Sequence, residues 1–86
     1  MYLHIGLNYL IKTRYIVAVC DIDNTTTSPI TRAFLAEAEK KGQIVSATTE
    51  LPKSFIVYQE KNKTIIYLTQ FSTVTLQKRS HTEELQ

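Results

Sequence analysis

Cysteine, glycine, proline and tryptophan are all scarce in this chain of 86 residues. It contains one cysteine, two glycines, two prolines and no tryptophan. A single cysteine excludes an internal disulfide framework and a cysteine-rich metal cluster, and it fits a reducing compartment such as the cytoplasm. Cys20 lies in an apolar run, where we expect a small core residue rather than a nucleophile. Two glycines are too few for a glycine-rich phosphate-binding loop.

Long hydrophobic runs and a strong charge imbalance are also missing. No apolar stretch approaches the ~20 residues of a membrane-spanning helix, and the N-terminus lacks the basic region of a signal peptide. The formal net charge is +2 at pH 7, which permits an anionic partner without requiring one. We therefore expect a cytoplasmic protein that does not enter the membrane.

The pattern of apolar and turn-forming residues predicts one small α+β domain with the order β-β-β-α-β-β-β-α. A chain this short has marginal stability alone. The domain is expected to cover residues 1–79, followed by a polar, frayed tail at 80–86. The expected strands are 2–5, 9–12, 15–20, 43–47, 55–59 and 64–69, and the expected helices are 28–41 and a short one that Ser72 caps.

Two of these elements carry more detailed expectations. Residues 15–20 are apolar on both faces, which predicts a central strand covered from both sides. The first helix should begin at Ser28 and Pro29 and end before Gly42. Its expected core-facing stripe consists of Ile30, Ala33, Phe34 and Ala38, with Leu35 at the margin.

One motif suggests chemistry. Asp21-Ile22-Asp23-Asn24-Thr25 matches the DxDxT signature of haloacid-dehalogenase-type phosphatases, in which the first aspartate is the nucleophile and magnesium binds the carboxylates. That fold needs a large parallel sheet and a further acidic pair that holds the metal. The 61 residues after Thr25 are too few for such a sheet, and their carboxylates are all glutamates with no aspartate pair among them. We interpret the motif as a polar strand-to-helix loop. We expect no enzyme activity, no cofactor, no metal site and no small-molecule substrate.

The basic residues are scattered as close pairs, which usually form solvated surface. The first helix is no basic recognition helix, because Glu37 and Glu39 lie among its cations. The five tyrosines could stack on nucleic-acid bases. Since Tyr15, Tyr58 and Tyr67 fall within expected strands, we favour a core or interface role for them.

Several stretches together resemble a known family. They are Tyr-Leu-His-Ile-Gly at 2–6, Thr-Arg-Tyr-Ile-Val at 13–17, Ser-Pro-Ile at 28–30, Leu-Pro-Lys-Ser at 51–54, and the run from Leu68 to Arg79. In order and spacing they resemble the RemA/RemB family of small bacterial extracellular-matrix regulatory proteins. The resemblance extends from residue 2 to about residue 79. No single stretch is diagnostic, and the combination carries the resemblance.

The resemblance implies a cytoplasmic regulator of biofilm-matrix gene expression that binds DNA and forms ring-shaped homo-oligomers. In the RemA-like members, DNA is contacted by an arginine just before the third strand and by an arginine pair in the loop before the fifth. The first arginine matches Arg14. The pair falls on Leu51 and Pro52, so both arginines are missing here, and Lys53 is the nearest cation. The resemblance therefore implies a nucleic-acid-binding site at Arg14 and Lys53.

Two functions remain open at this point. The chain is either an oligomeric DNA-binding regulator that contacts phosphates, or a structural or adaptor module that self-assembles, or binds another regulator such as a paralogue, without touching DNA. Self-assembly is expected in both cases, because a short chain with two-sided apolar strands cannot cover them alone. The two functions differ in whether Lys12, Arg14 and Lys53 converge on one exposed face.

Overall fold

The computed structural model describes residues 2–22 and 28–84, and it describes the side chains up to Arg79. The described elements follow the predicted order, which confirms a small α+β domain. They are β1 (Tyr2–Gly6), β2 (Tyr9–Lys12), the 3-10 turn η1 (Thr13–Tyr15), β3 (Ile16–Asp21), α2 (Pro29–Lys40), β4 (Ile44–Ser46), β5 (Ser54–Glu60), β6 (Lys63–Thr69) and α3 (Thr73–Glu84).

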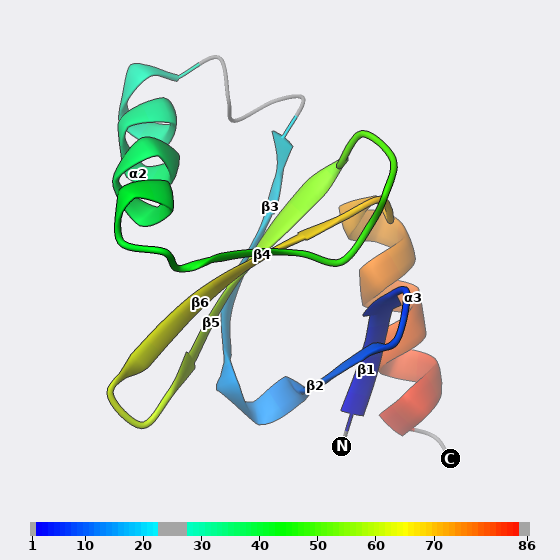
Figure 1. Ribbon diagram of the computed structural model, residues 1–86. Helices are drawn as coiled ribbons and strands as arrows, with labels where there is room; N and C mark the ends of the chain where they lie inside the picture. The colour runs from blue at the N-terminus through cyan, green and yellow to red at the C-terminus, as the bar shows by residue number, and fades with distance from the viewer. Residues whose placement is uncertain (1, 23–27, 85–86) are drawn as a thin grey trace.

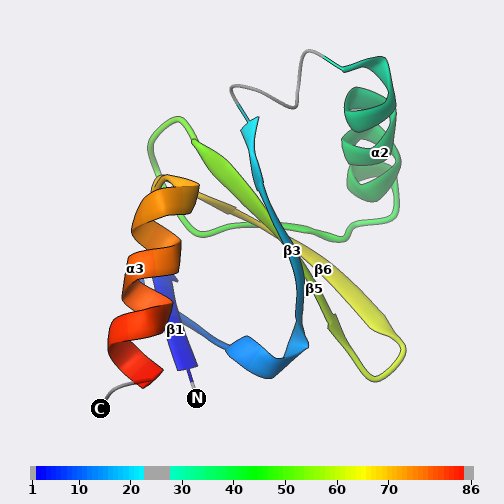
Figure 2. The same ribbon diagram turned by 180° about the vertical axis from the view of Figure 1, so that it is seen from behind.

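The elements form three layers (Figure 1). The middle layer is a four-stranded sheet with the strand order β3-β5-β6-β4. Its neighbours are antiparallel except for β4 and β6, which run parallel. The helix α2 covers one face, while the separate β1–β2 hairpin and α3 cover the other, as the reverse view in Figure 2 also shows.

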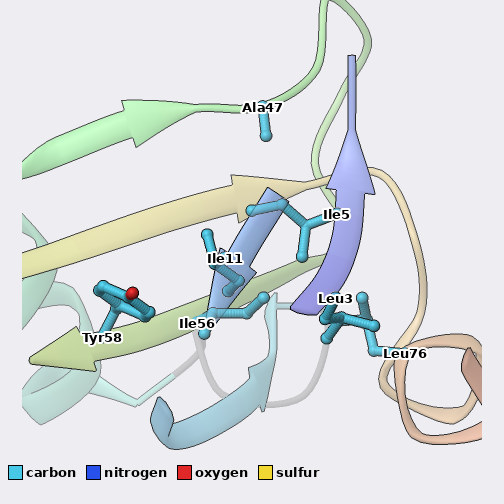
Figure 3. Packing of buried hydrophobic residues seen from close by; sticks show 7 residues of the cluster. All are labelled: Leu3, Ile5, Ile11, Ala47, Ile56, Tyr58 and Leu76. Atoms are coloured by element: carbon cyan, nitrogen blue, oxygen red, sulfur yellow. The ribbon is translucent and has the colours of Figure 1, made fainter. Parts of the chain in front are cut away.

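Both faces of the sheet are packed. On the hairpin side, seven buried residues form the larger core, shown in Figure 3: Leu3, Ile5, Ile11, Ala47, Ile56, Tyr58 and Leu76. On the α2 side, the smaller core consists of Ala38, Phe55 and Ile66. Because successive strand residues point to opposite faces, β5 contributes Phe55 to one core and Ile56 to the other. Each such fully buried side chain stabilises the fold by roughly 1.5–3 kcal/mol.

The prediction of a central third strand is wrong. β3 lies at one edge of the sheet, and β5 and β6 occupy the centre. Val17 is 63% exposed and Val19 is 39% exposed, so β3 is not covered from both sides within one chain. The pairing with β5 also shifts register between Ile16 and Ala18, which places an extra residue, Val17, in the strand. A bulge of this kind is common at sheet edges.

The ends of α2 agree with the prediction. Ser28 has extended dihedral angles, Pro29 is the first helical residue, and Lys41 is the C-cap. Gly42 follows with φ +69°, the left-handed conformation that glycine supplies at helix ends. The N-cap hydroxyl of Ser28 makes no capping hydrogen bond.

The predicted apolar stripe of α2 is correct only in part. Ala38 is buried and Leu35 packs at the edge of the smaller core. Ile30, in contrast, is 82% exposed and Phe34 is 43% exposed, although the Phe34 ring lies 6.5 Å from that of Phe55. The helix therefore turns the side of Leu35 and Ala38 to the sheet and leaves the Ile30 side in solvent.

The hairpin is fixed to the sheet at its turn. The carbonyl of Ile5 accepts a hydrogen bond of 2.6 Å from the buried Thr69 hydroxyl. Next to it, Gly6 has φ +135° and packs against the backbone of Ala47. Leu7 completes the turn at φ +47°. These contacts join the N-terminal hairpin to β6 and to the residue that follows β4.

The final helix is longer than predicted. Ser72 caps it as expected, because its hydroxyl accepts a 3.1 Å hydrogen bond from the Thr75 N–H. The helix then continues to Glu84, into the segment 80–86 that was expected to be frayed. Residues 85 and 86 lie outside the described residues. No helix within the described part of the chain is long and apolar enough to cross a membrane.

Candidate functional site

Arg14 lies on the short 3-10 turn η1, where the chain passes from the hairpin into β3. The flanking residues Lys12 and Ile16 are extended, and the N–H of Ile16 donates to the carbonyl of Thr13. The turn leaves Arg14 exposed. Its guanidinium carbon lies 5.5 Å from the centroid of the Tyr15 ring, within reach of a cation–π interaction.

The ammonium group of Lys12 lies near the same Tyr15 ring. The ammonium nitrogen of Lys12 lies 5.8 Å from the centroid of Tyr15, and it also lies 3.9 Å from a carboxylate oxygen of Glu60. Both side chains of this ion pair are 37% exposed, so the pair contributes no more than about 1 kcal/mol. The structure thus brings Lys12 and Arg14 together on one aromatic side chain.

A row of packed tyrosine rings supports the η1 turn. The rings of Tyr15 and Tyr58 are 5.9 Å apart, those of Tyr58 and Tyr67 are 5.5 Å apart, and those of Tyr9 and Tyr67 are 6.0 Å apart. The buried Tyr58 hydroxyl lies 3.4 Å from the N–H of Lys12 and 3.4 Å from Glu60. Burial raises the pKa of Tyr58 and also that of Tyr67. Tyr58 is therefore a core residue, and Tyr67 packs partly buried against the same core, as predicted. Tyr15 also packs against this core, but it lies in η1 and not in the strand expected at 15–20.

The turn between β5 and β6 adds two cations at the same end of the molecule (Figure 1). Lys61 and Lys63 are exposed on this turn, and Lys63 pairs with Glu60 across the hairpin. We call the set Lys12, Arg14, Lys61 and Lys63 the basic end. Glu60 is the acidic residue among them. An end of this composition attracts anions.

Lys53 lies at the opposite end of the β3–β5 pair. Its backbone N–H donates to Thr69 and its carbonyl accepts from Ile22, both at 2.9 Å. In the same pair, Ile16 lies opposite Tyr58 at the Arg14 end. At about 3.3 Å per residue, the length of β3 separates Arg14 from Lys53 by roughly 20 Å. Lys12 and Arg14 converge, and Lys53 does not join them within one chain.

The loop before β5 is held in place by its own polar contacts. The Thr48 hydroxyl donates to the Gln70 side chain at 2.7 Å and accepts from the Glu50 N–H at 3.0 Å. This anchored loop presents Leu51, which is 89% exposed. At the position where the resemblance places an arginine pair, the molecule therefore displays an apolar side chain.

Sequence reasoning missed one feature of the C-terminal helix. Arg79, which we grouped with solvated surface cations, lies 4.3 Å from the centroid of the Phe71 ring and 3.4 Å from Nδ1 of His4. The Nε2 atom of His4 is 2.7 Å from the carbonyl of Leu7. Arg79 therefore attaches α3 to the hairpin. Phe71 lies eight residues before Arg79 and outside α3, so the periodicity of the helix gives no signal for this contact.

The acidic motif after β3 is described only at its start. Asp21 ends β3, and residues 23–27 lie outside the described residues. Cys20, just before it, is half-buried against the smaller core, and burial raises the pKa of its thiol. Among the side chains that the structure describes, in residues 2–22 and 28–79, no three of histidine, cysteine, aspartate or glutamate lie close enough to hold a metal ion.

Comparison with known proteins identifies the family. The sequence model of the RemA-like family, described as extracellular matrix regulatory protein A-like, matches residues 2–79. Extracellular matrix regulatory protein B of Bacillus subtilis (strain 168) is 34% identical over 80 residues, which cover 93% of this chain and 90% of that protein. The chain belongs to the RemA-like family of extracellular matrix regulatory proteins. This confirms the resemblance that the sequence suggested.

Proposed function

We propose that this chain is a cytoplasmic regulator of extracellular-matrix gene expression that binds DNA as a homo-oligomer through phosphate contacts. The observation that carries the proposal is the basic end. Arg14 is exposed there and lies on the Tyr15 ring beside Lys12. A cation that is already positioned loses less conformational entropy when it meets a phosphate.

Phosphate contact, rather than base reading, fits the shape of this surface. The cations lie on a short turn and on a hairpin, and neither is a helix that could enter the major groove. Contacts of this kind position a protein on DNA without reading its sequence. Repetition around an oligomer supplies multivalency, so a mild charge on each subunit is sufficient.

A DNA-binding titration against salt tests the proposal. Arg14→Ala should weaken binding about equally on unrelated duplexes, and it should reduce the slope of log K against log[salt] by about 0.9 per contact removed. Lys40→Ala, which removes an exposed cation from α2 instead, is the matched control and should bind like the wild type. If Arg14→Ala and the wild type have the same affinity and slope, the assigned contact is wrong.

Assembly is supported by the apolar surface. On the β1–β2 hairpin, β3 and α3, several large apolar side chains are more than half exposed: Tyr2, Leu7, Leu10, Val17 and Val74. Light scattering at micromolar concentration should give a mass of several chains. A stable single-chain mass under these conditions would contradict the oligomeric part of the proposal.

The second candidate function is an adaptor that binds a paralogous regulator and not DNA. The specific observation in its favour is the anchored loop that presents Leu51 in place of a cation. If the wild type shows no affinity for DNA even at low salt, the adaptor function replaces the DNA-binding one. Leu51→Ser should then abolish capture of the paralogue and leave the oligomer mass unchanged.

In both cases the proposed activity is non-catalytic. Asp21 lies at the end of β3, and neither the wild type nor Asp21→Asn should hydrolyse a phosphate ester. Hydrolysis of a generic phosphate ester with magnesium, lost in Asp21→Asn, would establish a phosphatase instead.

A further inference from the structure

The outer edge of β3 differs from a protected sheet edge. Native proteins usually blunt such edges with lysine, proline or a bulge, because unpaired strand backbones pair with other chains. From Ile16 to Cys20 the strand contains neither charge nor proline. Its bulge lies at the beginning, between Ile16 and Ala18. From Ala18 to Asp21 the strand pairs regularly with β5, so this stretch of its outer side has the geometry of a normal strand, and the bulged residue Val17 lies directly before it.

The alternation of hydrogen bonds shows which residues face this edge. Ile22 donates its N–H to Lys53 on the β5 side. In an antiparallel pair every second residue exchanges these bonds, so Cys20 and Ala18 also face β5, and Val19 faces outward. The side chains of Val17 and Val19 are 63% and 39% exposed. The edge therefore combines outward backbone groups with exposed β-branched side chains.

We propose that β3 pairs antiparallel with β3 of a second copy of this chain, about a two-fold axis at Ala18. This inference rests on the homo-oligomer proposed above and specifies its contact. In this register Ala18 lies opposite Ala18 of the second copy, and Val17 of each copy lies opposite Val19 of the other. Such a contact is self-complementary, as a two-fold interface requires, and it joins the two sheets into one.

Charge favours the antiparallel arrangement. β3 begins beside the cations Lys12 and Arg14 and ends at Asp21. Antiparallel pairing places the basic beginning of each strand near the acidic end of the strand in the other copy. Parallel pairing would instead place the two basic beginnings together and the two acidic ends together. The opposite sheet edge is less suited to pairing, because β4 has three residues and Ile44 and Val45 are half-buried.

Cross-linking tests the register. With Cys20→Ser as background, Ala18→Cys should form a covalent dimer on mild oxidation. Ala18 would be a non-hydrogen-bonded pair with Cα atoms about 4.5 Å apart, within the range for a disulfide. The matched control is Ser46→Cys in the same background, at the β4 edge. The proposal is overturned if Ala18→Cys yields no more covalent dimer than Ser46→Cys.

A second variant guards against a folding defect at Ala18. Val19→Lys should weaken self-association by about twofold to thirtyfold in sedimentation, because two Val17–Val19 cross-strand pairs are lost together. Ile30→Lys, an equally drastic change on α2 at an 82% exposed position, should leave self-association unchanged. Equal association of the Val19→Lys variant and the wild type, with native circular dichroism, overturns the proposal.

These measurements contain no DNA, so they separate the two proposals. A covalent Ala18→Cys dimer together with absent DNA binding upholds the β3 contact and removes the DNA-binding function. An oligomer that binds DNA but fails both tests keeps the function and removes the β3 contact.

Discussion

Replacing Gly6 by alanine is the sharpest test of how the hairpin is attached to the sheet. Gly6 has φ +135°, a backbone conformation that residues with a side chain rarely adopt. A Cβ atom built on it would overlap the carbonyl oxygen of Ala47, and this oxygen belongs to the backbone and cannot rotate away. Gly6→Ala must therefore move the β1–β2 hairpin away from the residue that follows β4.

The expected loss has two parts. A residue held in an unfavourable region of φ/ψ costs about 1–3 kcal/mol, and forcing an extra methyl group into a packed site costs about 1–3 kcal/mol more. The sum, about 2–6 kcal/mol, is large for a chain of this length, whose total stability should lie at about 4–13 kcal/mol. We expect Gly6→Ala to lose a large fraction of its free energy of unfolding.

Urea unfolding followed by far-ultraviolet circular dichroism measures this loss. The chain provides its own control, since Gly42 also has a positive φ, +69°, but an added Cβ there would meet nothing within 4 Å. Gly42→Ala should lose roughly 1–2 kcal/mol from the backbone conformation alone. If Gly6→Ala loses no more than Gly42→Ala, the contact with Ala47 does not restrict the hairpin as we argue.

Three further changes follow from buried polar groups. Thr69→Val should lower the free energy of unfolding by about 1–3 kcal/mol in urea, because it leaves the buried carbonyl of Ile5 without its donor; an unchanged midpoint would contradict this. Burial raises the pKa of Tyr58 and Tyr67, so the stability they contribute is full below the unfolded pKa of about 10 and is lost as pH rises through the folded values. The urea midpoint of the wild type should decrease as the pH rises through that window, and it should decrease less in Tyr58→Phe. Burial also raises the pKa of Cys20, so a disulfide reagent should label it more slowly in the folded protein than in urea; equal rates would contradict this.

The order of elements could be predicted because its signals are local. Ser28, Pro29 and Gly42 define the ends of α2 through their own backbone preferences. The hairpin turn at residues 60–63 lies between two strongly apolar segments, and β5 and β6 pair across it as expected. Signals of this kind depend on few neighbours, so one sequence is sufficient.

The position of β3 depended on pairing across the chain. A strand that is apolar on both faces can lie at the centre of a sheet or at an edge that another molecule covers, and its own residues do not distinguish the two. Here β5 pairs with β3 on one side and with β6 on the other. The helix α2 then packs with Leu35 and Ala38 inward, and its rotation follows from the sheet beneath it rather than from its own periodicity.

The candidate site was predictable in part for the same reason. Family resemblance identified Arg14, and its place before β3 follows from the order of elements. The shared contact of Lys12 and Arg14 with Tyr15 depends on side-chain geometry in a 3-10 turn, for which the sequence has no signal. The separation of Lys53 follows from the antiparallel register of β3 and β5, which the sequence alone does not determine.

The separation of Arg14 and Lys53 leads to a final prediction. Antiparallel pairing of two β3 strands would place the Arg14 end of one copy beside the Ile22 end of the other, and Ile22 is bonded to Lys53. Arg14 is then separated from Lys53 of the second copy by two strand spacings, which is roughly 10 Å. Within one chain the same two residues are roughly 20 Å apart. One DNA backbone could meet both cations across the contact.

A double-mutant cycle on DNA affinity distinguishes these distances. Independent sites give additive losses within about 0.3–0.5 kcal/mol, whereas groups that share a partner are coupled by about 0.5–3 kcal/mol. We expect Arg14→Ala and Lys53→Ala to be coupled in the wild-type background and additive in Val19→Lys, in which the β3 contact is weakened. Lys40→Ala should be additive with Arg14→Ala in both backgrounds, since Lys40 lies on α2. Additive losses for Arg14 and Lys53 in the wild type would mean that each cation meets DNA alone, and the β3 contact would then have no part in forming the binding surface.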